Sequence, residues 1–151
     1  MPAGWQVEVL HSGTASGKLI GGNLSVLASL CGTPYLPSGK DSILFIEEVS
    51  EDSYVIDRHM QQLLDSGMLK NVKGIIIGTM RHCEPMQHQP YDYSVREVFQ
   101  HYADLLNVPV IYNFPVGHGS INGFLPLHVQ AVLKAEEGKQ PQLIIAEDYA
   151  K

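Results

Sequence analysis

Residues 43–49 read Ile-Leu-Phe-Ile-Glu-Glu-Val, an apolar run that ends in two adjacent carboxylates. The four apolar residues at its start predict a short strand. In open α/β sheets, ligands gather outside the carboxyl ends of the strands. Glu47 and Glu48 therefore lie where a functional site is expected. A pair of acidic residues at a strand end is nevertheless more often a solvated sheet edge.

Strands and helices alternate on both sides of this stretch. Strands are predicted at 5–10, 43–46, 72–77, 108–112, 125–133 and 142–145. Helices are predicted between an N-cap at Asn23 and a C-cap at Gly32, over 56–64, and from the capping box at 94–97 to Leu106. The glycines at 13, 17, 21 and 22 predict repeated tight turns. This order indicates an α/β domain with parallel strands, helical crossovers and additional antiparallel strands near the C-terminus.

Length and charge limit the kinds of protein that the chain can be. It has 151 residues, of which 44% are hydrophobic, and this suffices for one domain but not for two catalytic lobes. A single domain covering residues 1–151 is therefore expected. The net charge is −6. An acidic surface repels phosphate backbones, so no nucleic-acid partner is expected.

Cysteine usage and hydropathy bear on the location. Cys31 and Cys83 have no CxxC spacing, which favours a reducing compartment over a disulfide framework. No apolar run approaches the roughly 18 residues that a membrane span needs. No basic-then-apolar leader opens the chain. A cytoplasmic protein without a membrane partner is expected.

A carboxylate and an imidazole form the strongest candidate site. His118 follows the strand at 108–112 and has a glycine on each side, in the run Pro-Val-Gly-His-Gly at 115–119. A carboxylate that orients an imidazole is the supporting half of a nucleophile–base–acid triad. Gly21-Gly22-Asn23 precedes a helix N-terminus, where free N–H groups favour an anion. A turn histidine and a simple helix cap are the ordinary alternatives for these two motifs.

Other motifs are weaker. His82, Cys83, Glu84 and His88 have ligand chemistry, but their spacing matches no familiar zinc pattern, so no metal site is predicted. Residues 13–18 lack the spacing of a phosphate-binding loop, and the chain contains no GxSxG nucleophile motif. No cofactor is expected.

Ordered motifs across residues 13–133 resemble the C-terminal half of the LD-carboxypeptidase family. These serine peptidases trim murein tetrapeptides and include the microcin C self-immunity peptidases. The matching stretches are GKLIGGNLS (17–25), GTPY (32–35), ILFIEEV (43–49), IDR (56–58), GIIIG (74–78) and PVGH (115–118). The run containing GGNLS is specific, and the ordered set is more so.

The resemblance implies a two-domain enzyme whose C-terminal domain, of the swivelling β/β/α type, supplies a glutamate and a histidine. Carried over by motif, these catalytic residues are Glu47 and His118, and Gly22 and Asn23 lie in the substrate pocket. Glu48 stands where the family often has Asp. Arg58 matches a family position to which no role is assigned.

The same resemblance places the nucleophilic serine in an N-terminal domain that this sequence does not match. The chain alone is therefore expected to be inactive, with a serine domain supplied in cis or in trans and a murein peptide as substrate. Two alternatives to murein hydrolysis stay open, a microcin C-type self-immunity peptidase and a non-catalytic peptide-binding module. A structural α/β domain that forms a homodimer is a third.

Overall fold

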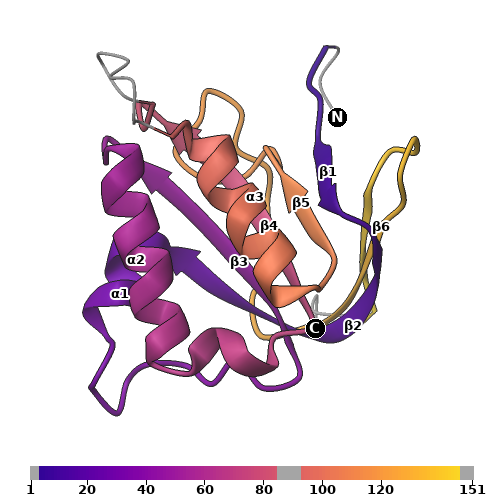
Figure 1. Cartoon of the computed structure of the whole chain (residues 1–151). Helices are drawn as coiled ribbons and strands as arrows, with labels where there is room; N and C mark the ends of the chain where they lie inside the picture. The colour runs from indigo at the N-terminus through magenta and orange to yellow at the C-terminus, as the bar shows by residue number, and fades with distance from the viewer. Residues whose placement is uncertain (1–3, 85–92, 147–151) are drawn as a thin grey trace.

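A curled seven-stranded sheet runs through the residues described by the computed structural model, which are 4–84 and 93–146 (Figure 1). The strand order is β1-β5-β4-β3-β2-β6-β7. The strands are β1 (Glu8–His11), β2 (Gly13–Asn23), β3 (Ser42–Val49), β4 (Gly74–Arg81), β5 (Val110–Tyr112), β6 (Gln130–Ala135) and β7 (Gln142–Ile145). The helices are α1 (Leu24–Ser29), α2 (Ser53–Asp65), α3 (Val95–Leu106) and a short 3-10 helix, η1 (Met68–Asn71).

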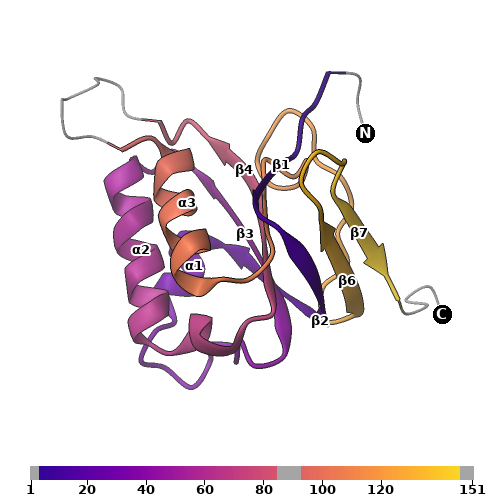
Figure 2. The same cartoon turned by 45° about the vertical axis from the view of Figure 1, so that its right-hand side comes forward.

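The helices cover one face of the sheet. Strands β2, β3, β4 and β5 are parallel neighbours in chain order, with α1, α2 and α3 in the successive crossovers. Because such crossovers are right-handed and here all step in one direction, the three helices lie on the same side. Figure 2 shows them on one side of β3 and β4, and the β6–β7 hairpin, at the curled end of the same sheet, on the other. The predicted α/β fold with added antiparallel strands is confirmed.

Two apolar cores lie on the two faces of β3. Leu44 and Ile46 pack with the helices, whereas Ile43 and Phe45 pack with β6 and the chain that precedes it. All four are buried, because successive side chains of a strand point to opposite faces and both faces are covered. The same alternation applies to Glu47 and Glu48 at the end of β3, so their side chains also point to opposite faces of the sheet.

The prediction of tight turns at the glycines of 13–22 is wrong, because this segment is strand β2. Its first half pairs antiparallel with β6, and its second half pairs parallel with β3. The glycines permit close approach within the sheet. A Cβ at Gly17 would lie 2.6 Å from the carbonyl oxygen of Asp41. Local sequence rules treat glycine as a turn residue, and only the neighbouring strands show why it is needed here.

Other element boundaries shift for local reasons. The capping box is confirmed: the Ser94 hydroxyl accepts from the Glu97 N–H, and the Glu97 side chain accepts from the Ser94 N–H. The Asn23 N-cap is also confirmed, but α1 ends at Ser29, earlier than the predicted Gly32. The strand predicted at 125–133 begins only at Gln130. Residues 125–129 do not form that strand because Pro126 lacks an N–H and His128 has a φ of +64°.

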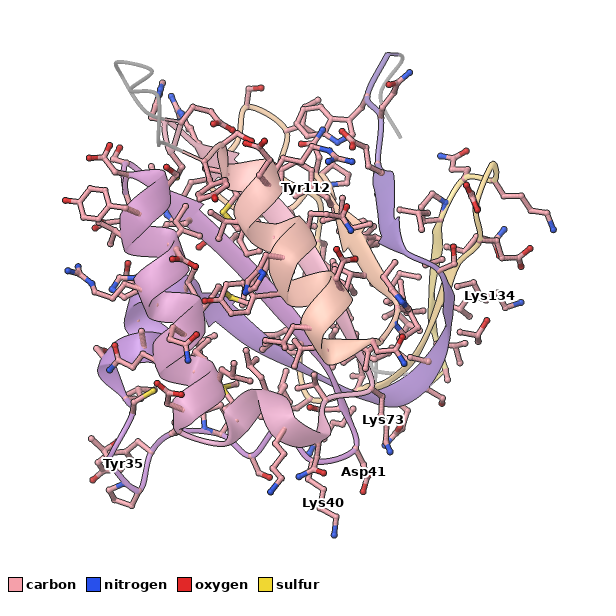
Figure 3. All side chains as sticks on the ribbon, viewed as in Figure 1. Tyr35, Lys40, Asp41, Lys73, Tyr112 and Lys134 are labelled. Atoms are coloured by element: carbon pink, nitrogen blue, oxygen red, sulfur yellow. The ribbon has the colours of Figure 1, made fainter. Side chains whose placement is uncertain are left out.

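The amino ends of the parallel strands hold an exposed ion pair. Asp41, just before β3, lies 3.2 Å from the ammonium of Lys73, just before β4. Figure 3 shows both side chains at the lower end of the molecule, where these strands begin. The carboxyl ends of the same strands lie at the opposite edge, and the candidate residues gather there.

Candidate functional site

Glu47 is a buried carboxylate at the carboxyl end of β3. Its side chain is 6% exposed and faces away from the helices. Opposite it, Gly78 and Thr79 of β4 occupy the place of one residue, which shifts the β3–β4 register. Such a bulge bends a strand and re-aims the side chains beside it.

His118 meets this carboxylate from a position 71 residues further along the chain. Its Nδ1 lies 2.6 Å from Glu47 Oε2, and its backbone N–H donates to the same oxygen at 3.2 Å. An ionised carboxylate only accepts, so Nδ1 carries the proton and the lone pair lies on Nε2. The imidazole is 58% exposed, which leaves its far edge open to solvent.

Thr79 and two glycines shape the loop that carries His118. The Thr79 hydroxyl accepts from the Gly119 N–H at 3.0 Å and donates to the Val116 carbonyl at 3.4 Å, so one side chain holds the loop on both sides of His118. Gly117 has a φ of +122°, and a Cβ there would lie 2.9 Å from Glu47 Oε2. Gly117 thus permits the approach of the histidine to the carboxylate, whereas Gly119 permits the close contact with Thr79, because a Cβ there would lie 2.7 Å from Thr79 Cγ2. Thr79 carried no signal in the sequence.

The Glu47 carboxylate changes the acidity of the imidazole. Its hydrogen bond and its negative charge raise the pKa of His118 above the ordinary histidine value, against the opposing effects of burial and of the Arg81 guanidinium. Because folding raises this pKa, the pair stabilises the folded chain fully below about pH 6.5. That contribution is lost as the pH rises through the higher pKa of the folded state.

We expect the His118 ring to titrate above the usual histidine range in the 151-residue chain. In Glu47→Gln, the pKa of His118 should fall, because the charge that stabilises the imidazolium is gone. Ring ¹H–¹⁵N NMR titration measures this, with the His118 signal assigned by its loss in His118→Gln and the other histidine signals reporting that the fold is kept. An unchanged pKa in Glu47→Gln would contradict the assigned contact.

Glu48 points to the opposite face and has a different environment. Its carboxylate accepts hydrogen bonds from the Asn23 side-chain amide (2.8 Å), the Ser25 N–H (2.8 Å), the Ser25 hydroxyl (2.6 Å) and the Val49 N–H (2.9 Å). Burial raises the pKa of Glu48, but the hydrogen bonds from Ser25, Val49 and Asn23 outweigh it and hold the pKa below its usual value. Glu48 thus ties the end of β3 to the start of α1 and is not a solvated edge residue.

Replacement of Glu48 by Gln is expected to lower the free energy of unfolding by about 2–3 kcal/mol, because an amide N–H₂ would face groups that are themselves donors. Folding lowers the pKa of Glu48. The stability that Glu48 contributes relative to Gln is therefore fully present at pH values above the unfolded-state pKa of the carboxyl. It decreases as the pH falls through the folded-state pKa. Urea denaturation at pH 7 and at pH 3 measures both effects. The control is Glu137→Gln, the same change at an exposed position. Equal stability of the two variants would show that the four contacts contribute nothing.

Gly22 and Asn23 are the last two residues of β2, beside the end of β3 that carries Glu47 and Glu48. Asn23 is the register partner of Glu47, and its side-chain oxygen accepts from the Val26 N–H at 3.1 Å. Its amide donates to Glu48, so the side chain is held by the fold. Gly22 has a φ of +152°, and a Cβ there would meet nothing within 4 Å. The surface over Gly22 is therefore open.

The remaining sequence candidates are not brought into this cluster. His82 accepts a hydrogen bond from Arg81, Cys83 is buried, and His88 lies outside the described residues. Arg58 is exposed on α2. Within residues 4–84 and 93–146, no group of three or more His, Cys, Asp or Glu side chains is placed to hold a metal ion. No helix in this described part is long and apolar enough to cross a membrane.

A buried carboxylate that orients an exposed imidazole at the carboxyl edge of an α/β sheet is an arrangement typical of hydrolases that work by nucleophilic and general-base catalysis. The comparison with known families agrees with that class. The family described as LD-carboxypeptidase C-terminal domain matches residues 16–133. The chain belongs to this family.

The relatives of the chain include two carboxypeptidases and an MccF-like protein. The murein tetrapeptide carboxypeptidase of Pseudomonas aeruginosa is 35% identical over 82% of this chain and 40% of its own length. The crystal structure of muramoyltetrapeptide carboxypeptidase from Oxalobacter formigenes is 31% identical and superposes with a TM-score of 0.80, over 94% of this chain and 49% of that one. An MccF-like protein from Bacillus anthracis is 32% identical with a TM-score of 0.76, over 93% of this chain and 43% of that one. The chain spans about two fifths of the length of the curated relatives it matches.

Proposed function

We propose that this chain is the Glu/His-bearing domain of a serine-type LD-carboxypeptidase that removes the terminal D-alanine from murein tetrapeptide. The observation that carries the proposal is the 2.6 Å contact between Glu47 Oε2 and His118 Nδ1, next to an imidazole edge that is open to solvent. A carboxylate in this position selects the tautomer whose Nε2 can take a proton. Family membership and the name of the Oxalobacter relative support the substrate class.

The reaction is acyl transfer, with each group in one role. His118 Nε2 takes the proton of a serine hydroxyl, which attacks the carbonyl carbon of the amide that holds the terminal D-alanine. Glu47 orients the imidazole and stabilises the imidazolium that forms. His118 then protonates the leaving amine, and water releases the peptide from the acyl-enzyme in a second cycle of the same proton transfers. Gly22 and Asn23 line the substrate pocket, where the open space over Gly22 leaves room for the peptide.

The serine is proposed to come from polypeptide outside residues 1–151. Among residues 4–84 and 93–146, the hydrogen bonds of His118 run to Glu47 and Arg81, and none joins its ring to a serine hydroxyl. The chain alone is accordingly proposed to be inactive.

A chimera tests this proposal. The chain replaces the matching domain of the Oxalobacter formigenes enzyme, whose structure superposes on it. Release of D-alanine from murein tetrapeptide is measured for the chimera and for the isolated chain. We expect release by the chimera only. Release by the isolated chain at the rate of the chimera would overturn the outside nucleophile, and a folded chimera that binds tetrapeptide without release would favour a peptide-binding module.

A microcin C-type self-immunity peptidase is the second candidate, favoured by the 32% identity to the MccF-like protein. The two candidates differ in substrate, because one cleaves a murein peptide and the other a nucleotide-linked peptide. The same chimera assayed with an aminoacyl sulfamoyl adenosine distinguishes them. Turnover of the nucleotide compound with no release of D-alanine would replace the first proposal by the second.

A further inference from the structure

Arg81, the last residue of β4, places a cation beside His118. Its Nη1 donates to the His118 carbonyl at 3.1 Å, and its Nε donates to the His82 ring at 3.1 Å. The ion pairs of the described residues are Lys73–Asp41, Arg96–Glu8, His118–Glu47 and Lys139–Glu136, so no carboxylate within residues 4–84 and 93–146 neutralises Arg81. What distinguishes Arg81 is its position, because its guanidinium contacts the residue whose imidazole meets Glu47.

The guanidinium keeps donors for a ligand. It has five N–H groups, of which the two contacts use two. The others lie on a planar fork that matches a carboxylate with two parallel hydrogen bonds. Arg81 is exposed, so an incoming anion can reach this fork.

A hollow of about 300 Å³ lies next to Arg81. Trp5, Asn113 and Ser120 contribute to its lining, together with Gly119, the residue that follows His118. The Trp5 indole N–H donates to the Asn113 carbonyl at 2.7 Å, which holds the aromatic wall in place. Since liquid water takes about 30 Å³ per molecule, the hollow has room for one small amino acid and several waters.

We propose that Arg81 binds the α-carboxylate of the substrate's terminal residue and that this hollow receives the departing amino acid. The inference rests on the proposed function, because it names the feature of the peptide that this site recognises. A carboxylate held on Arg81 places the last amide of the peptide, and no earlier one, next to the His118 imidazole. Arg81 would thereby restrict cleavage to the terminal bond.

Because Arg81 is charged, binding of a carboxylate to it should also change the pKa of His118. The guanidinium lies close enough to lower the pKa of His118, in opposition to Glu47. A bound carboxylate neutralises that charge. A free-acid ligand should therefore move the titration of the His118 ring upward, whereas its C-terminal amide should not.

The test compares N-acetyl-L-lysyl-D-alanine with its C-terminal amide, each titrated into the ¹⁵N-labelled 151-residue chain. We expect the acid to bind about tenfold more tightly than the amide, the size of one lost charge-assisted interaction. In Arg81→Gln the preference should vanish. In Lys73→Gln, which removes the same charge at the other end of the parallel strands, it should persist.

Outcomes for this inference and for the proposed function can be separated. An acid preference that survives in Arg81→Gln, or that is absent from the wild-type chain, overturns the carboxylate site even if the chimera releases D-alanine. If the preference for the acid depends on Arg81 but the chimera is inactive, the carboxylate site is supported and the proposed reaction is refuted. In an active chimera, Arg81→Gln should raise KM about tenfold with a smaller change in kcat. A purely structural role for Arg81 would leave the acid-to-amide ratio unchanged.

Discussion

The chimera carrying Glu47→Gln is expected to lose about 10⁴-fold in kcat, the usual cost of replacing a triad carboxylate by its amide. Gln is isosteric with Glu, but its N–H₂ group can donate to His118 Nδ1. That contact favours the tautomer whose Nε2 already carries a proton and cannot act as a base. The loss of negative charge also destabilises the imidazolium. Steady-state release of D-alanine from murein tetrapeptide measures the effect.

The matched control for this experiment is Glu137→Gln in the same chimera, because Glu137 is exposed in the turn between β6 and β7. Its kcat should equal that of the parent. Thermal unfolding should show that Glu47→Gln is folded, so that the loss reflects chemistry. A kcat for Glu47→Gln within tenfold of the parent would refute the role assigned to Glu47.

Gly21→Ala is expected to lower the free energy of unfolding by about 4 kcal/mol or more, and the variant to fold poorly. Gly21 has a φ of +135°, and a Cβ there would overlap the carbonyl oxygen of Phe45 on the neighbouring strand. The overlap involves backbone on both sides, so no side chain can move to relieve it. Strands β2 and β3 would have to separate at the register pair Gly21–Phe45.

Gly22→Ala is the matched control, because its φ of +152° is also strained but its Cβ would meet nothing within 4 Å. Backbone strain alone costs about 1–3 kcal/mol. Urea denaturation of the two isolated variants therefore separates strain from overlap. If Gly21→Ala were no less stable than Gly22→Ala, the close approach of β2 to β3 would not be a constraint on the fold.

Local patterns predicted much of the fold. The apolar runs at 43–46, 72–77 and 108–112 lie in or across β3, β4 and β5, and the capping box at Ser94 begins α3. These signals depend on residues a few positions apart, which is the range over which periodicity and capping act. The same rules wrongly predicted turns at the glycines of 13–22, because these glycines allow close approach of neighbouring strands, which local patterns do not reveal.

Some residues of the candidate site were predicted from the sequence, and others became visible only in the structure. Glu47 and His118 were identified by their motifs, and the glycines beside His118 indicated a bend. Nothing in the sequence marked Thr79, whose hydroxyl holds the loop from a strand 37 residues away. Arg81 was likewise unmarked, since its relation to the His118 carbonyl exists only once β4 and the loop lie side by side.

By itself, the sequence determined the strands β3, β4 and β5, the N-caps at Asn23 and Ser94 and the set of residues with suitable chemistry, because short-range patterns encode each of these. The tertiary structure decided which of two adjacent glutamates faces the imidazole. Successive side chains on β3 point to opposite faces, so Glu48 is taken up by α1 and Glu47 is left for the loop of His118. That division depends on which element covers each face of the sheet, and contacts between segments far apart in the chain establish it.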